Sequence, residues 1–482
     1  MKKILYIGLI PLILLTSSCE DFLDEQPVSE LSADKFWKSE GDIRAGIAGM
    51  YDGFQGVVSG THIEWGGARS DNWTHGGTST EATDFTNNSL QSGLDEVDWS
   101  QLYTTIHRAN LAIKYLPTIT GGDISETNKN NYLAQAYAMR AYCYFLGAKI
   151  WGDVPLILQP ISDRDFKPTR TAVDVVLDSV IVDLDKALEL VNPDNDNVFE
   201  INIGGILAMQ TDVYMWQHDY QKAIEATDKL IDLGRYDLAE NASDWKEMLI
   251  DPNTSNEPIW AIYWLILEDG GSGIADKIGS SDHTSPFIID PNLVVKWSQQ
   301  KGDYRRGLTY DTLAAQSDDG AQDTWKYYPL DPVSKEPGQS VPKGDFAEIR
   351  PCIYRLADIL LLRAEAFNQL SNEPGAVTLL NEVRVARGLD GVEEDDFNTI
   401  EELETAILDE RQFELFAEGK RWFDLRRTGR VAEVMNPLLD KRAVSGETVT
   451  KFIENDPRFL FPIFEEVLIA NPKLEQNVPY SR

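Results

Sequence analysis

The sequence predicts a mostly α-helical fold of paired helical hairpins, with long irregular loop insertions and a few short strands. Three observations predict this fold class. Apolar residues recur at helical spacing over several long stretches. Small residues stand where the two predicted helices within 214–233 would cross. Two long segments between helices, 55–98 and 252–350, are instead rich in Gly, Ser, Thr, Asn and Asp, which is typical of irregular structure.

The first residues have the organisation of an export signal. Lys2 and Lys3 precede the apolar run Ile4–Leu15, and the small residues Thr16–Ser18 lead into Cys19. The run is shorter than the roughly 20 residues that span a bilayer, so we interpret it as a lipoprotein signal that is cleaved before Cys19. The alternative is an ordinary secreted protein in which Cys19 has no special role.

Composition and these signals divide the chain and set limits on its partners. The predicted parts are a removed signal 1–18, a lipidated acidic leader 19–38, an N-terminal helical part 39–250, an aromatic-bearing insertion 251–350, and a C-terminal helical part with its tail 351–482. With 44 basic against 79 acidic residues, the chain is not suited to binding nucleic acid or anionic lipid by charge. Besides Cys19 only Cys143 and Cys352 occur, and we favour two buried free thiols over a disulfide.

A capping box starts the first predicted helix. Ser39 and Asp42 have the required spacing, and the apolar residues that follow predict a helix over 42–54. The segment 55–98 then resembles a long polar loop with embedded tryptophans, and such loops are typically functional or disordered. The same periodicity predicts helices over 99–116, over 130–150, from Thr171 (capped by Asp174) through Val191, over 206–217, 220–233, 356–370 and 376–387, and from Thr399 through 416–418. The segment 260–266 is predicted to be a mostly buried strand.

One of these helix pairs resembles a tetratricopeptide unit. Trp216 and Tyr220 stand on either side of a short turn, and Ala223 and Ala226 supply small residues to the second helix. No strict period of about 34 residues runs through the chain, so stacked hairpins with irregular insertions describe it better than a regular solenoid.

The sequence offers little catalytic or metal chemistry. No two histidines have the spacing of a zinc site; they are His62, His75, His107, His218 and His283. Glu410, Glu414 and Glu418 recur every four residues, and with Arg384 and Arg387 nearby we interpret them as structural ion pairs. We expect no catalytic residue, no cofactor and no bound metal.

Several motifs resemble the SusD/RagB family in the order in which that family has them. They are Arg140 to Phe145, Trp151-Gly152-Asp153-Val154-Pro155-Leu156, Arg355 to Ala366, and Ile407 to Arg427 with its Arg421-Trp422-Phe423-Asp424-Leu425-Arg426-Arg427. The resemblance implies a mostly α-helical protein with about four tetratricopeptide-like helix pairs. It also implies a lipoprotein of the outer membrane, exposed at the cell surface, that binds a glycan or another nutrient without catalysis. Its partner would be a SusC-like TonB-dependent transporter.

The ligand site is predicted from the chemistry of sugars. Sugar rings stack their C–H faces on aromatic rings and need polar side chains around the rim. We therefore expect ligand contacts from the two long loop segments, namely Trp65, Arg69, Asp71, Asn72 and Trp73 in the first and Trp297, Tyr304, Trp325, Tyr327 and Tyr328 in the second. The alternative is that each of these side chains fills the core beneath its loop, as we expect of Trp260 and Trp264.

Two other functions remain open at this stage. A surface-anchored glycoside hydrolase is consistent with export and with abundant carboxylates, since such enzymes use a pair of them. A purely structural cap whose loops bind no ligand is the other.

Overall fold

The computed structural model describes residues 36–76, 79–119, 124–161, 165–279, 285–310, 312, 324–332, 340–342, 348–443 and 450–481. The predicted signal, most of the acidic leader and the predicted lipidation residue Cys19 lie outside the described residues.

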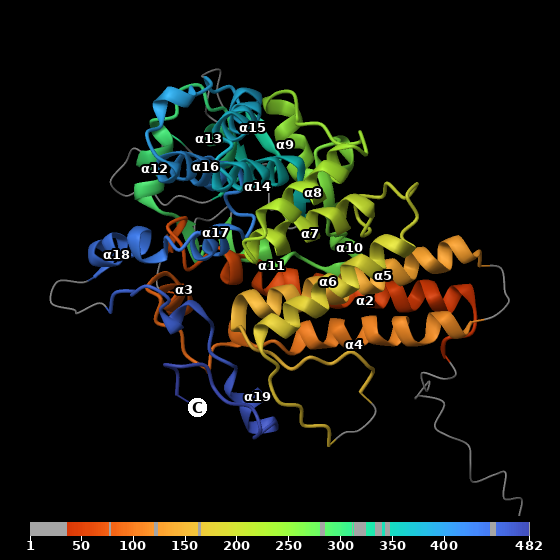
Figure 1. Cartoon of the computed structure of the whole chain (residues 1–482). Helices are drawn as coiled ribbons and strands as arrows, with labels where there is room; N and C mark the ends of the chain where they lie inside the picture. Colours follow the sequence, from red (N-terminus) through yellow and green to blue (C-terminus); the bar gives the residue numbers. More distant parts are fainter. Residues whose placement is uncertain are drawn as a thin grey trace, which may run out of the picture.

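Within the described part of the chain, four pairs of neighbouring helices form the scaffold, which confirms the predicted hairpin architecture (Figure 1). The pairs are α2 (Glu40–Gly66) with α4 (Ser100–Tyr115), α5 (Glu126–Trp151) with α6 (Val173–Leu190), α7 (Ile203–Trp216) with α8 (Tyr220–Ile231), and α14 (Leu356–Gln369) with α15 (Glu373–Ala386). Consecutive pairs also contact each other, α4 with α5, α6 with α7, and α8 with α14. Stacking is required because a single amphipathic hairpin cannot bury its own apolar face.

Helix α2 begins as predicted but extends well beyond the predicted 42–54. The Ser39 hydroxyl accepts from the backbone N–H of Asp42, and the Asp42 carboxylate accepts from the backbone N–H of Ser39 at 2.7 Å. Past residue 54, buried Val57 and Ile63 keep the helical period up to Gly66. Glycine costs about 1 kcal/mol in a helix, and tertiary packing of these apolar residues offsets that cost. The first predicted loop therefore starts only after Gly66.

Two other predicted helix boundaries need correction. Helix α6 begins at Val173, whose N–H donates to the Asp153 carboxylate at 2.8 Å, so Asp174 is not its cap. The predicted helix from Thr399 ends at Glu414 instead of 416–418. Its continuation is blocked because the chain turns through positive φ just after it, 63° at Ala417.

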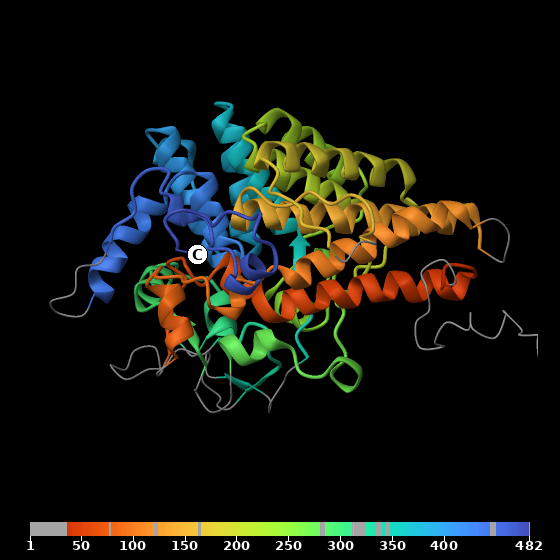
Figure 2. The same ribbon diagram turned by 90° about the horizontal axis from the view of Figure 1, so that it is seen from below.

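The insertion between α8 and α14 is held by short antiparallel strand pairs. β2 (Pro258–Ala261) pairs with β6 (Cys352–Arg355), β1 (Trp73–His75) with β3 (Phe287–Ile289), and β4 (Leu330–Pro332) with β5 (Ser340–Pro342). Because β2 and β6 lie at its two ends, their pairing closes the insertion at its base. Short helices complete this part and its surroundings: α3 (Thr80–Thr86), α9 (Ala242–Ile250), α10 (Ile266–Asp269), α11 (Gly273–Ile278), α12 (Pro291–Ser298) and α13 (Arg305–Thr309). Seen from below, the green segments of the insertion lie on the side of α2 opposite to the yellow scaffold helices, and α11 packs against α2 (Figure 2).

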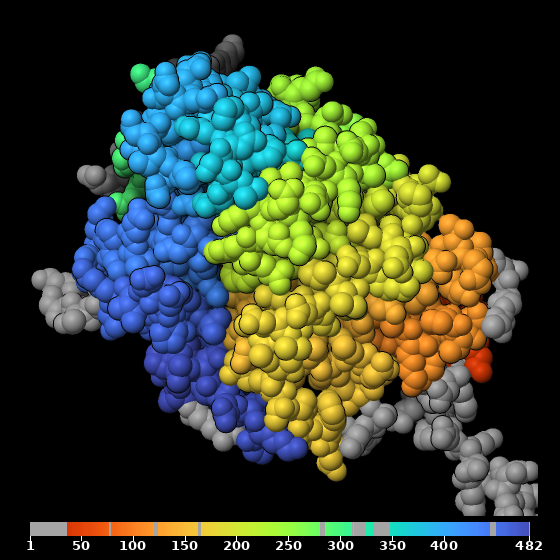
Figure 3. All heavy atoms as spheres, viewed as in Figure 1, coloured from red at the N-terminus to blue at the C-terminus, as the bar shows by residue number. Residues whose placement is uncertain are grey.

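The C-terminal part covers the remaining side of the scaffold. Its helices are α16 (Ile400–Glu414), α17 (Arg421–Arg427), α18 (Val431–Arg442) and α19 (Glu465–Ala470). In the space-filling view its blue atoms border both the cyan and the yellow segments (Figure 3). One hydrophobic cluster runs from Trp37 to Leu474, so scaffold, insertion and C-terminal part share a core.

Two further properties of the described residues concern their helices and their cysteines. None of their helices is long and apolar enough to cross a membrane. Cys143 and Cys352 are both buried free thiols, as predicted. Burial raises the pKa of the Cys352 thiol to about 12, which makes it a poor nucleophile.

Candidate functional site

The aromatic residues predicted from the first loop segment lie inside the protein. Trp65 and Trp73 are 4% and 0% exposed, and the Trp73 ring packs on Phe416 with a centroid separation of 4.6 Å. Asn72 is also buried, and its side-chain oxygen accepts from the Gln412 amide at 3.0 Å. These three side chains are buried in the protein interior.

The two charged residues from the same segment connect distant parts of the chain. The Asp71 carboxylate accepts from the Arg421 guanidinium at 2.8 Å. Arg69 is fully buried, its guanidinium lies 4.3 Å from the ring centroid of Trp422, and it donates to the Asn88 side-chain oxygen at 2.8 Å. Both residues hold segments together that are distant in the sequence.

The aromatic residues predicted from the second loop segment are placed in the same way. Trp297, Trp325, Tyr327 and Tyr328 are at most 5% exposed, and Tyr304 is half-buried. The Trp297 indole donates to the Asp303 carboxylate at 2.8 Å, and the Tyr327 hydroxyl donates to the carbonyl of Ala417 at 2.9 Å. Ligand contact by the ten predicted residues stays a prediction, although all of them except Asp71 and Tyr304 are buried in this structure. The rings fill the core beneath their loops, as Trp260 and Trp264 also do.

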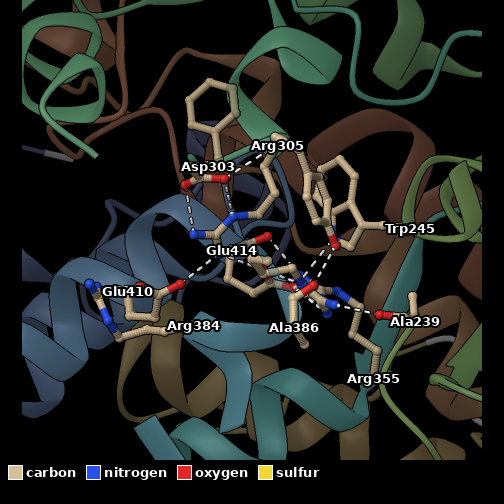
Figure 4. Close-up of polar contacts among 12 residues, drawn as sticks. Ala239, Trp245, Asp303, Arg305, Arg355, Arg384, Ala386, Glu410 and Glu414 are labelled. Atoms are coloured by element: carbon tan, nitrogen blue, oxygen red, sulfur yellow. Dashed lines mark hydrogen bonds and ion pairs between the residues drawn. The ribbon is translucent and has the colours of Figure 1, made fainter. Parts of the chain in front are cut away.

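The predicted ion pairs around Glu410, Glu414 and Glu418 are confirmed and form a buried charge network (Figure 4). The Glu414 carboxylate pairs with Arg305 at 2.5 Å, with Arg387 at 3.0 Å and with Arg355. Further pairs in the network are Arg305 with Asp303, Arg355 and Arg387 with Glu257, Arg355 and Lys326 with Glu418, and Arg384 with Glu410.

This network is closed to substrates. The side chains of Arg305, Arg355, Arg387 and Glu414 are all 0% exposed. Burial alone would raise the pKa of the Glu414 carboxyl, but attraction to Arg387, Arg355 and Arg305 holds it well below its usual value. A permanently ionised, fully paired carboxylate is suited to fixing the α16 region, and it offers neither a proton nor access to a ligand.

An exposed aromatic ring occurs instead in a cleft between α2 and the start of the insertion. The cleft has a volume of about 310 Å³ and is lined by Ala48, Tyr51, Asp52, Gln55, Phe199, Ile262, Tyr263 and Asp269. We call it the Tyr263 cleft, because Tyr263 is 45% exposed. Its volume is at the lower end of the usual range for small-molecule sites, about 300 to 1,000 Å³.

The Tyr263 ring is held in a fixed orientation. Phe199 packs against it edge to face, with centroids 5.3 Å apart and an interplanar angle of 79°. The Arg350 guanidinium lies 5.6 Å from the ring centroid and is itself fixed by Glu348 at 2.5 Å and by the Trp264 carbonyl at 3.0 Å. A ring fixed before binding loses little conformational entropy when a ligand stacks on it.

Polar side chains stand around this ring. The Gln55 amide donates to the carbonyl of Tyr263 at 3.0 Å, which ties α2 to the insertion. Asp52 is 70% exposed and uses one oxygen to pair with Arg108 at 2.7 Å, and Asp269 uses one oxygen to accept from the backbone N–H of Leu265. Each of these three side chains keeps an oxygen that makes no hydrogen bond within the described residues, so each can accept from a ligand hydroxyl.

Sequence reasoning missed Tyr263 because 260–266 was treated as one buried strand. β2 ends at Ala261, and beyond it only Ile262 and Trp264 face inward. Tyr263 stands between these two buried residues and points the other way. The two-residue alternation of an extended chain was the signal that could have identified it.

A cluster of charges fixes the segment that follows the cleft. The Lys277 ammonium on α11 pairs with Glu64 of α2 at 2.8 Å, with Glu81 at 2.5 Å and with Glu96 at 3.4 Å. One ammonium cannot neutralise three carboxylates, and burial raises the pKa of the Glu64 carboxyl to about 7 although Lys277 lowers it. The cluster therefore ties the insertion to α2, on the C-terminal side of the part of α2 that lines the Tyr263 cleft.

This cluster makes stability depend on pH in a defined direction. Since Glu64 binds its proton more tightly in the folded protein, its contribution to the free energy of unfolding falls as pH rises from about 4.5 to about 7. Between pH 5 and pH 7.5, the contribution of Glu64 to the free energy of unfolding falls by about 2 kcal/mol in the unmodified protein. The variant Glu64→Gln lacks this titration, so its free energy of unfolding should rise by about 2 kcal/mol relative to that of the unmodified protein over the same range. Urea unfolding of both proteins at the two pH values measures this. Equal changes in both proteins would contradict the assignment.

Metal chemistry finds no support in the part of the chain that the structure describes. No group of three or more His, Cys, Asp or Glu side chains there is placed to hold a metal ion.

Comparison with known proteins gives consistent matches over both halves of the chain. A family model described as "SusD family" matches residues 266–480, and one described as "Starch-binding associating with outer membrane" matches residues 21–203. The chain is 32% identical to SusD-like protein P38 of Formosa agariphila, with 100% of each chain covered. It is 27% identical to SusD-like protein P2 of the same organism, over 99% of this chain and 100% of that protein.

Solved structures share its fold. A SusD superfamily protein from Bacteroides vulgatus aligns with a TM-score of 0.76 and 19% identity, over 92% of this chain and 99% of that one. A laminarin-binding SusD-like protein aligns with a TM-score of 0.74 and 22% identity, over 92% of this chain and 100% of that one. NanU of B. fragilis has the same TM-score and identity, over 95% and 100% of the two chains.

Proposed function

The chain belongs to the SusD/RagB family, and from this premise we propose that it captures a glycan in the Tyr263 cleft and delivers it for import. One observation carries the proposal: the fixed, half-exposed Tyr263 ring has oxygen acceptors around it from Asp52, Gln55 and Asp269. A sugar ring needs both an apolar face to stack on and acceptors for its hydroxyls. The names of the laminarin-binding structure and of the starch-binding family model agree with this class of ligand.

The charge of the cleft favours a neutral glycan over an acidic one. Asp269 puts a carboxylate without an ion pair among the described residues at its rim, Asp52 is paired with Arg108, and the whole chain has a formal net charge of −35. A uronate or sulfate group would be repelled by this field, while neutral hydroxyls can donate to the carboxylates. Arg350 does not reverse this balance because it is paired with Glu348 and Asp251.

Delivery requires attachment and a partner. We propose that Cys19 carries a lipid anchor that holds the protein at the outer membrane, exposed at the cell surface. Several acyl chains on one cysteine make such an anchor effectively permanent, because each buried methylene contributes about 0.8 kcal/mol. The partner would be a SusC-like TonB-dependent transporter, and the acidic residues after Cys19 would connect the anchor to the helical body.

Capture without hydrolysis fits the cleft better than a glycosidase does. A general acid needs a carboxyl whose surroundings keep it protonated, as in a buried apolar pocket. Asp52 is instead 70% exposed and paired with Arg108. The carboxylates of the buried network have no access to a polysaccharide.

Calorimetric titration with a panel of neutral and acidic polysaccharide fragments tests this function. We expect saturable binding of at least one neutral glycan, weaker binding of acidic ones, and no release of reducing ends from the bound material. Binding of peptides alone would contradict glycan capture, and steady release of reducing ends would support the hydrolase instead.

A further inference from the structure

A second cavity is lined by other residues than the Tyr263 cleft and differs from it in chemistry. It has a volume of about 700 Å³ and is formed by the turn after α3, the end of α18 and the C-terminal segment. Its lining includes Asn87, Asn88, Arg442, Thr450, Arg458 and Tyr480. We call it the Arg442 cavity.

Arg442 is anchored by its terminal nitrogens and leaves one donor unused. Its side chain is 8% exposed, and the terminal nitrogens donate to the carbonyls of Thr86 and Trp73 and to the Asp290 carboxylate at 2.8 Å. The Nε atom is buried and has no hydrogen-bond partner in the described chain. An unused buried donor costs about 1 to 3 kcal/mol, so a group that accepts from it is favoured there.

Asn87 leaves an acceptor unused in the same cavity. Its side-chain oxygen is buried without a hydrogen-bond partner among the described residues. The next residue, Asn88, has a left-handed backbone with φ of 56°, and its side chain exchanges hydrogen bonds with Arg69 at 2.8 and 3.2 Å. Strained backbone of this kind persists where the surrounding structure fixes it.

Arg69 positions two walls of this cavity at once. Besides holding Asn88, its guanidinium donates to the carbonyls of Arg458 and Phe459 at 2.5 and 3.2 Å. Arg69 is 0% exposed and lies behind the cavity wall, so we assign it a positioning role in this cavity.

The charges of the cavity wall are neutralised. Arg442 is paired with Asp290 at 2.8 Å, and Arg458 with Asp456 at 2.7 Å. An anion would therefore find no net positive charge, and it would meet the unused acceptor of Asn87. A group that both accepts and donates a hydrogen bond without carrying charge fits this wall; water, an amide and a hydroxyl all do so, and a sugar hydroxyl is the one that the proposed glycan supplies. The half-buried Tyr480, whose hydroxyl donates to the Leu460 carbonyl, adds an aromatic ring to the lining.

We propose that the Arg442 cavity is a second sugar site, in which the hydroxyls of one neutral sugar residue accept from Arg442 Nε and donate to the Asn87 side-chain oxygen. It rests on the proposed glycan capture and gives the protein a second place that holds a neutral sugar, by hydrogen bonds and not by stacking.

Crystals of the protein soaked separately with D-glucose, D-galactose, D-mannose and D-xylose test the site. We expect density for at least one of these sugars in the Arg442 cavity. Density in the Tyr263 cleft alone would overturn this inference and leave the proposed function standing. Density in the Arg442 cavity alone would support the inference and count against the proposed stacking site. Density in neither place would overturn it.

Titration of the same sugars by ligand-detected NMR adds a matched pair of variants. The Asn87 side chain makes no hydrogen bond within the described chain, so Asn87→Leu and Asn87→Asp should both fold, which circular dichroism checks. In a Tyr263→Ala background, Asn87→Leu should weaken the remaining sugar binding about tenfold, the equivalent of one hydrogen bond. Asn87→Asp retains the acceptor and should keep the affinity. Equal affinity in the Leu and Asp variants would contradict the proposed contact.

Discussion

Replacing Glu414 with glutamine lowers the free energy of unfolding by about 3 to 5 kcal/mol, the largest stability effect that we expect in this chain. The carboxylate pairs with Arg305, Arg355 and Arg387, and all four side chains are 0% exposed. Glutamine keeps the size of the side chain but removes its negative charge. Each of the three buried guanidinium groups therefore loses one carboxylate partner. Urea unfolding at neutral pH measures the difference.

The control for this variant lies on the same helix. Glu401 is exposed in the first turn of α16, and Glu401→Gln should change the free energy of unfolding by less than about 0.5 kcal/mol. If Glu414→Gln were no more destabilising than Glu401→Gln, the network would not stabilise the fold as described.

Replacing Tyr263 with alanine weakens the binding of the neutral glycan about 10- to 100-fold, because the variant loses the most exposed ring among the described lining residues of its cleft. Calorimetric titration with the glycan that binds most tightly in the panel measures this loss. Tyr263→Phe keeps the ring and should retain most of the affinity.

Leu267 provides a matched surface control for Tyr263. It is 90% exposed on α10, next to the cleft but outside its lining, and Leu267→Ala should leave the affinity unchanged. Equal losses in Tyr263→Ala and Leu267→Ala would mean that the effect of Tyr263 is indirect.

The helical scaffold was accessible from sequence because periodic burial determines it. The stripes of apolar residues in α6 and α8 reflect packing through one face of each helix, whereas α5 and α7 are buried on nearly all sides, and this packing of successive helices repeats along the chain. The second half of α2 was missed because glycines and polar residues interrupt the pattern, although Val57 and Ile63 are buried there. The ion pairing of Glu414 was likewise predictable, while its partners Arg305 and Arg355 were not, since they are far away in the sequence.

The candidate site could not be predicted in the same way. Composition identifies aromatic residues in irregular segments, but whether a ring is buried depends on contacts with distant elements. Trp73 is covered by Phe416, and Trp297 stacks on Phe413. Tyr263, in contrast, remains exposed because its neighbours in the sequence take the inward positions. Only the three-dimensional arrangement distinguishes these cases.

A crystal structure of the protein with the tightest-binding neutral oligosaccharide tests the central claim most directly. We expect a sugar ring stacked on Tyr263, with hydroxyl groups donating to the side-chain oxygens of Asp52, Gln55 or Asp269. A well-ordered oligosaccharide bound elsewhere, with the Tyr263 cleft free of ligand, would contradict it.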